Sequence, residues 1–143
     1  MSRIRLTQHR RGALRLQLSP GGLNKLRLLF DQHSFWADDR TPEQLRRMLN
    51  GSAAVVSAWD GDHLIGFGRA TSDGVFRAVL WDVVVAASHQ GQGLGRRIVE
   101  SLLQQPCIHQ AERVYLMTTN SCGFYTQLGF ELITSQKLMM KRQ

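Results

Sequence analysis

A glycine-rich turn between a strand pattern and a helix pattern is the feature that most constrains how this chain folds. Residues 81–97 read WDVVVAASHQGQGLGRR, an apolar run followed by three alternating glycines and then two arginines. A strand that turns through glycines into a helix aims unpaired backbone N–H groups and the positive end of the helix dipole at one point. Glycine has no Cβ, so an anion can come close to those amides. The stretch therefore predicts an anion site, most naturally one for a pyrophosphate.

Two common phosphate motifs do not match this turn. The Walker A motif ends in Gly-Lys-Ser/Thr, whereas Gly95 is followed by Arg96 and Arg97, which excludes the ordinary P-loop. The dinucleotide motif GxGxxG would place its third glycine at position 96 and belongs after the first strand, but this turn lies past the middle of the chain. A dinucleotide fold is therefore disfavoured. A glycine-rich turn without a ligand stays open as the alternative.

The charge of the chain favours anionic partners but does not identify one. Its 143 residues include 18 Lys and Arg against 11 Asp and Glu, a formal net charge of +7. Such an excess favours nucleic acid, phosphorylated cofactors or an acidic surface. Five of the basic residues fall near the N-terminus: Arg3, Arg5, Arg10, Arg11 and Arg15. We interpret residues 1–12 as a flexible, solvated basic arm and do not expect nucleic acid as a partner, since no nucleic-acid-binding motif is present.

Metal and membrane chemistry are not indicated. The two cysteines form no CxxC motif, and the five histidines show no HxxxH or HExxH spacing, so we expect no metal. No apolar run approaches the ~20 residues that span a bilayer, and the N-terminus lacks the apolar region of a signal peptide. We therefore expect a soluble, cytoplasmic protein with no membrane partner.

The order of periodic segments predicts a single α/β (α+β) domain over residues 1–143. Helical spacing or capping residues mark 22–33, 41–50, 93–104 and 122–128 as helices. Alternating or β-branched patterns mark 13–18, 53–59, 63–71, 75–86, 113–118, 130–133 and 137–140 as strands. We expect a mixed, mostly antiparallel sheet of six or seven strands, flanked by about four helices.

Two motifs resemble those of the GNAT N-acetyltransferase superfamily. Gln90-x-x-Gly93-x-Gly95 is similar to the signature with which that family binds the pyrophosphate of acetyl-CoA. Residues 123–130, GFYTQLGF, are similar to a later segment of the family, and the order of elements matches over nearly the whole chain. Four further sequence segments resemble those of the plant-and-cyanobacterial branch of the family: 35–36, 40–43, 56–60 and 81–85. That branch includes enzymes described as serotonin N-acetyltransferases and as protein lysine acetyltransferases.

The resemblance implies acetyl-CoA as cosubstrate and a set of residues that bind it. The strand before the turn would contact the pantetheine arm through its backbone, the turn would hold the pyrophosphate, and one residue after the fifth expected strand would contact CoA. These residues are Val83, Val84, Val85, Gln90, Gly91, Gln92, Gly93, Leu94, Gly95, Arg96 and Asn120. Because the valine contacts are through backbone, the alternative that these valines are simply core is compatible with this role.

The resemblance also implies direct attack of a primary amine on acetyl-CoA in a ternary complex. Tyr125 stands where the family places its general acid, and a phenol is a donor at neutral pH. The alternative for Tyr125 is that its ring is simply packed in the interior, like those of the neighbouring phenylalanines. Asp82 interrupts an apolar run and is our candidate for the base, acting directly or through water. The alternative for Asp82 is a carboxylate satisfied by a nearby arginine or backbone amide.

The acceptor amine is less constrained. Phe35, Trp36 and Trp81 could form aromatic walls for an arylalkylamine such as serotonin, or could be ordinary core. A lysine side chain of a protein is the second acceptor class. A non-catalytic sensor that binds acetyl-CoA without turnover is a third possibility. The chain could act as a monomer or as a homodimer.

Overall fold

Five strands form one mixed sheet in the computed structural model, which describes residues 3–143. The strands are β1 (Ile4–His9), β2 (Ala54–Asp60), β3 (His63–Ser72), β4 (Arg77–Val85) and β5 (Arg113–Tyr115), and they lie in this order across the sheet. The first four pair antiparallel, and β5 joins β4 in parallel. The prediction of a mixed, mostly antiparallel sheet is confirmed.

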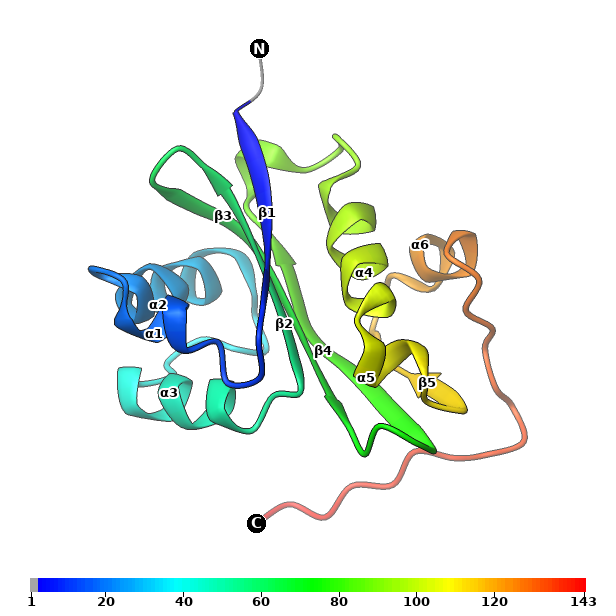
Figure 1. Cartoon of the computed structure of the whole chain (residues 1–143). Coiled ribbons are helices and arrows are strands. Elements are labelled where there is room, and N and C mark those ends of the chain that lie inside the picture. Colours follow the sequence, from blue (N-terminus) through cyan, green and yellow to red (C-terminus); the bar gives the residue numbers. More distant parts are fainter. Residues whose placement is uncertain (1–2) are drawn as a thin grey trace.

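Helices cover both faces of this sheet (Figure 1). One face carries α1 (Leu14–Leu18), α2 (Gly22–His33) and α3 (Pro42–Asn50); the other carries α4 (Leu94–Gln104), α5 (Pro106–His109) and α6 (Cys122–Gln127). A short 3-10 turn, η1 (Ala87–His89), leads from β4 toward α4. The arrangement is a three-layer α/β domain with the sheet in the middle.

The core depends on β3, whose alternate residues face different layers. Phe67 meets Phe30 of α2 edge-to-face at 5.5 Å between ring centroids. On the other face Gly66 and Gly68 leave room for α4, because a Cβ at either position would come within 2.8 Å of Ile98. Two small residues in the strand thus allow α4 to lie directly against the sheet.

The helices with strong local signals were predicted at nearly their observed bounds. The expected helix at 41–50 begins with a complete capping box, in which Thr41 Oγ1 accepts from the Gln44 amide and the Gln44 side chain accepts from the Thr41 amide. Pro42 occupies the first turn, where its missing N–H costs nothing. The expected helices at 22–33 and 93–104 are also confirmed.

The N-terminal assignments were wrong. The segment 13–18, predicted as a strand, instead contains the short helix α1, and its N-cap Ala13 has a left-handed conformation (φ 49°). The first strand is instead β1, which lies inside the segment 1–12 that we interpreted as a flexible arm and pairs with β2 over its whole length. Exposed arginines alternate with half-buried Ile4 and Leu6 in this strand. The arginines suggested a solvated arm, although charged residues on one face are also typical of an edge strand.

The C-terminal strands predicted at 130–133 and 137–140 are absent from the described chain. Residues 129–143 run as an extended tail, and Leu132, Leu138 and Met139 are more than three-quarters exposed. β5 is also shorter than the expected strand at 113–118. Residues 3–143 therefore hold five strands and six α-helices rather than six or seven strands and about four helices, since alternation of apolar residues does not by itself supply a pairing partner.

Candidate active site

β4 and β5 pair for only three residues and then part. The parallel register joins Arg77 to Arg113 and ends at Val79 opposite Tyr115, the last residue of β5. β4 continues to Val85. Among residues 3–143 no strand pairs with that side of β4 beyond Val79. Backbone N–H and C=O groups along this edge can therefore bind an extended ligand in the place of a neighbouring strand.

A β-bulge in β4 lies beside the point at which β4 and β5 separate. Phe67 pairs with Val84 and Arg69 with Trp81, so β4 has one more residue than β3 between these pairs. Asp82 has a left-handed conformation there (φ 54°). An extra residue re-aims the side chains that follow it. As a result Val83 lies on the α4 side of the sheet, while Asp82 lies against residues from the connection between α2 and α3.

A cleft of about 540 Å³ joins the open edge of β4 to the glycine-rich turn and α6. Tyr125 and most of the residues predicted to bind acetyl-CoA line it: Val83, Val85, Gln90, Gly91, Gly93, Leu94, Gly95 and Arg96. Residues 83 and 125, far apart in the sequence, thus face one space. The volume lies in the range typical of small-molecule sites.

Three predicted residues lie outside this cleft, and five others complete it. Val84 is buried in the core at 3% exposure, whereas Gln92 and Asn120 are exposed without lining the cleft. The additional lining residues are His89, Ser121, Phe124, Gln127 and Leu128. Phe124 and Leu128 are four residues apart in the predicted helix at 122–128, a spacing that could have indicated their shared face.

The backbone of the turn is suited to an anion. Gly91 and Gly93 have left-handed conformations (φ 77° and 78°), and a Cβ at either position would meet no atom within 4 Å, so the space beside them is open. Gly93 is the N-cap of α4, and its carbonyl accepts from the Arg97 amide. In the described chain the amides from Gly91 to Arg96 have no backbone or side-chain acceptor. These donors fit a phosphate group at the helix N-terminus.

Tyr125 presents a neutral phenol to the cleft. Its ring packs edge-to-face against Phe124 and Phe130, with centroids 4.9 and 5.8 Å away. Burial raises the pKa of the Tyr125 phenol above its ordinary value. The hydroxyl therefore keeps its proton through and beyond the neutral range and is available as a donor.

Asp82 is held by four hydrogen bonds on the opposite side of β4. Its Oδ1 accepts from Trp36 Nε1 (3.1 Å) and Arg40 (3.2 Å), and its Oδ2 accepts from Arg40 (3.1 Å) and Arg69 (2.8 Å). A carboxylate has about four lone-pair positions, so few are left for a substrate proton. Burial alone would raise the pKa of Asp82, but the hydrogen bonds and charges of the two arginines outweigh it and lower the pKa.

The residues predicted for the acceptor pocket gather around Asp82 and outside the cleft. Phe35 and Trp36 are 70% and 48% exposed and pack edge-to-face at 5.1 Å. Trp81 is half-buried; its Nε1 donates to Thr71, and Arg69 lies over its ring. Phe35 and Trp36 therefore form a small exposed aromatic patch, which the hydrogen bond from Trp36 to Asp82 fixes to β4.

Residues 23–130 match the family model described as Acetyltransferase (GNAT) family, which covers most of the chain. The chain belongs to this family. The strand that parts from its neighbour and the amide-rich turn before α4 are thus features of a GNAT domain, and the resemblance inferred from the two sequence motifs is confirmed.

Several relatives come from plants. Serotonin N-acetyltransferase 2 of Oryza sativa is 39% identical over 98 residues, which cover 65% of this chain and 49% of that protein. GCN5-related N-acetyltransferase 2 of Arabidopsis thaliana is 44% identical over 95 residues (61% and 37%). Histone acetyltransferase TAP1 of Glycine max is 42% identical over 69 residues (48% and 30%). The chain matches about half or less of the length of these relatives.

A solved structure of a GNAT family acetyltransferase from Streptococcus pneumoniae shares the fold. It superposes with a TM-score of 0.75 at 23% identity, over 98% of this chain and 99% of that one. In the part of this GNAT domain that the structure describes, no group of three or more His, Cys, Asp or Glu side chains could hold a metal ion. No described helix is both long and apolar enough to cross a membrane.

Replacing Asp82→Asn is expected to lower the free energy of unfolding by about 2 kcal/mol at neutral pH, because Arg40 and Arg69 lose their anion. A carboxyl whose pKa is lowered by folding stabilises the protein fully above its unfolded pKa of about 3.9 and loses that contribution as the pH falls through the folded pKa. The stability difference between wild type and D82N should therefore narrow between about pH 5 and about pH 3. Urea unfolding at a series of pH values measures it.

D38N is the matched control, because Asp38 is exposed and forms no ion pair within residues 3–143. Its stability should follow that of the wild type at every pH. A D82N deficit that stays constant across this pH range would contradict the assignment of the carboxylate as the stabilising group.

Proposed function

We propose that this chain is an acetyl-CoA-dependent N-acetyltransferase that transfers the acetyl group to a primary amine by direct attack in a ternary complex. The observation that carries the proposal is the cleft in which Tyr125 faces both the unpaired edge of β4 and the free amides of the turn. Family membership supports acyl transfer from acetyl-CoA.

The binding roles follow from the donors that the chain presents. The amides from Gly91 to Arg96 would hold the pyrophosphate, aided by the positive end of α4. The open edge of β4 near Val83 and Val85 would bind the pantetheine arm as an added strand. The bound thioester supplies an activated acetyl group.

Tyr125 would act as the general acid. The amine nitrogen forms the new bond to the acetyl carbon, the bond from that carbon to sulfur breaks, and the sulfur leaves with the electron pair. A phenol whose pKa is raised by burial is protonated when the reaction needs it, and it would donate its proton to the departing sulfur. The proton lost by the amine passes to water, and the Tyr125 phenolate takes a proton back from water.

Asp82 would position groups around the acceptor and would not remove the proton itself. Its oxygens are already engaged by Trp36, Arg40 and Arg69, and its lowered pKa makes it a weak base at neutral pH. This environment favours the alternative in which arginines satisfy the carboxylate. Through Trp36 it would hold the aromatic patch at the edge of β4.

The exposed pair of Phe35 and Trp36 favours an arylalkylamine as acceptor, since aromatic side chains bind aromatic rings by edge and face contacts. A protein lysine is the second candidate, favoured by the similarity to a relative named as a histone acetyltransferase. Release of free CoA thiol from acetyl-CoA distinguishes them, with serotonin, tyramine, spermidine and a lysine-containing peptide as separate acceptors. We expect turnover with the two arylalkylamines. Turnover with the peptide alone would establish the second candidate, and binding without any turnover would indicate a sensor.

Tyr125→Phe should reduce kcat by about tenfold or more while acetyl-CoA affinity stays within about twofold, because only the proton donor is removed. Steady-state kinetics with the best acceptor and calorimetry with acetyl-CoA measure the two quantities. Tyr115→Phe is the matched control. Because Tyr115 lies on β5 outside the cleft, the kcat of this variant should equal that of the wild type. Full turnover by Y125F between about pH 6 and pH 9 would show that this phenol is not the acid.

Gly93→Asp should weaken acetyl-CoA binding by about tenfold or more, because it places a carboxylate beside the amides assigned to the pyrophosphate. Gly74→Asp is the matched control. Gly74 has the same left-handed conformation (φ 77°) and the same open surroundings, and it lies in the turn before β4, outside the cleft. Calorimetry of both variants measures the affinities. Equal affinities in the two variants would argue against the turn as the pyrophosphate site.

A further inference from the structure

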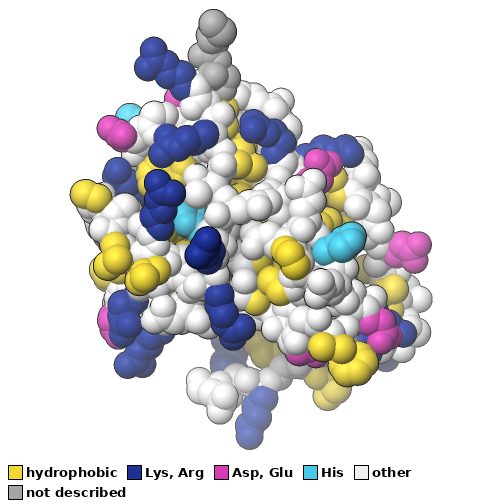
Figure 2. Space-filling view, in the orientation of Figure 1, with side chains coloured by type: hydrophobic (Ala, Val, Ile, Leu, Met, Phe, Trp, Pro, Cys, Tyr) yellow, Lys and Arg dark blue, Asp and Glu magenta, His cyan; other side chains and the backbone are white. Residues whose placement is uncertain are grey.

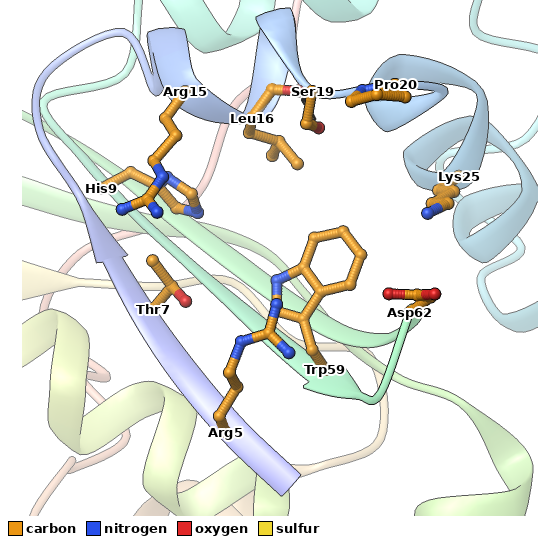
Figure 3. Close-up of a pocket in the computed structure, with 10 residues that line it drawn as sticks. All are labelled: Arg5, Thr7, His9, Arg15, Leu16, Ser19, Pro20, Lys25, Trp59 and Asp62. Atoms are coloured by element: carbon orange, nitrogen blue, oxygen red, sulfur yellow. Dashed lines mark hydrogen bonds between the residues drawn. The ribbon is translucent and has the colours of Figure 1, made fainter.

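A second cavity, of about 620 Å³, lies between β1, α1, the start of α2 and the end of β2 (Figure 3). It shares no lining residue with the cleft that holds Tyr125. Its size is again in the range of small-molecule sites. The proposed acetyl transfer gives it no role.

Positive charge dominates the lining of this second cavity. Arg5, Arg15 and Lys25 contribute three cations against the single carboxylate of Asp62. Among residues 3–143, neither Arg15 nor Lys25 forms an ion pair, and Arg5 donates only to the carbonyl of Gly61. Lys and Arg side chains also gather on this side of the surface, over β1 and α1 (Figure 2). Three cations with one carboxylate leave a net positive charge, so an anion would be stabilised among them.

Trp59 fixes two of these cations at the cavity. The Arg5 guanidinium and the Lys25 ammonium lie 5.6 and 5.5 Å from the centroid of its ring, within the range of cation–π attraction. The indole is 8% exposed, and its Nε1 donates to the buried hydroxyl of Ser57. The positions of Arg5 and Lys25 are thus set by a rigid group rather than by solvent alone.

His9 supplies a further polar group at the base of the cavity. It is 7% exposed, and its Nε2 lies 2.6 Å from Ser57 Oγ, while within residues 3–143 its Nδ1 has no partner. Burial, together with the charge of Arg15, lowers the pKa of His9, so the ring is neutral near pH 7. Because Ser57 Oγ already accepts from Trp59 Nε1, we assign its own proton to Nε2 of His9. The neutral ring then carries its proton on Nδ1 and can donate it into the cavity.

We propose that this second cavity is a binding site for a compact polyanion, a phosphorylated or polycarboxylate small molecule. Arg5, Arg15 and Lys25 neutralise its charge, and Nδ1 of His9 donates to one of its oxygens. The concave shape, with Trp59 and His9 nearly buried in its lining, favours a small ligand over an extended nucleic-acid strand, which a flat basic surface would suit.

Calorimetry of the full chain with sodium citrate and, separately, with inorganic phosphate tests this site and distinguishes the two sources of charge. We expect at least one of these anions to bind with a Kd below about 1 mM. The variant Arg5→Gln/Arg15→Gln should raise that Kd by about tenfold or more. Arg10→Gln/Arg11→Gln removes the same charge from exposed residues that line neither cavity and should change it by about twofold or less. Gly93→Asp, which alters the turn of the other cleft, should leave the citrate Kd unchanged.

Three results would overturn the proposal: no binding of either anion up to about 10 mM, equal weakening by the two double variants, or loss of citrate binding in G93D. NMR of the wild-type histidine rings provides a measurement that does not depend on the double variants folding. The His9 signals, assigned with His9→Gln, should shift as the anion is added. Binding heat without any shift of these signals would also exclude the site.

Discussion

The carboxylate of Asp82 accepts hydrogen bonds from two other parts of the fold at the point where β4 carries its extra residue. Trp36 and Arg40 come from the connection between α2 and α3, and Arg69 comes from β3. A buried carboxylate without such partners would be unfavourable, so the bulge and its ion pairs stabilise each other. Because the bulge places Val83 on the α4 side and Asp82 on the other, the cleft and the aromatic patch both depend on this cluster.

The parts of the fold that could be predicted are those with signals local in the sequence. The capping box at Thr41 and Gln44 and the periodic apolar residues of 22–33 and 93–104 specify helices within one or two turns of chain. The glycine-rich turn was equally local, since glycines and the first amides of a helix lie within a few residues of one another. Tyr125 was predicted as a site residue from a second motif, and its side chain lines the same cleft.

The parts that could not be predicted depend on distant partners. Alternation at 13–18 and at 130–140 indicated strands, but a strand needs another backbone beside it, and β1 has that partner in β2 while the C-terminal segment has none in the described chain. The role of Asp82 could not be predicted for the same reason. Its run of apolar neighbours showed that the carboxylate would be buried, but Arg40 and Arg69 lie 42 and 13 residues away in the sequence. Only the tertiary structure reveals that they occupy its oxygens.

The elements β2 and α2 connect the second cavity to the surroundings of the cleft that holds Tyr125. Trp59 lines the second cavity, and the next residue, Asp60, lies 3.0 Å from Nε2 of His89 in the lining of the cleft. Along α2, Lys25 lines the second cavity, and Nδ1 of His33 accepts from the Ala87 amide at the start of the turn. An anion that displaced Trp59 or Lys25 would act on elements that also hold the residues before the glycine-rich turn. Any such coupling is reciprocal: if the anion strengthens acetyl-CoA binding, acetyl-CoA strengthens anion binding by the same factor.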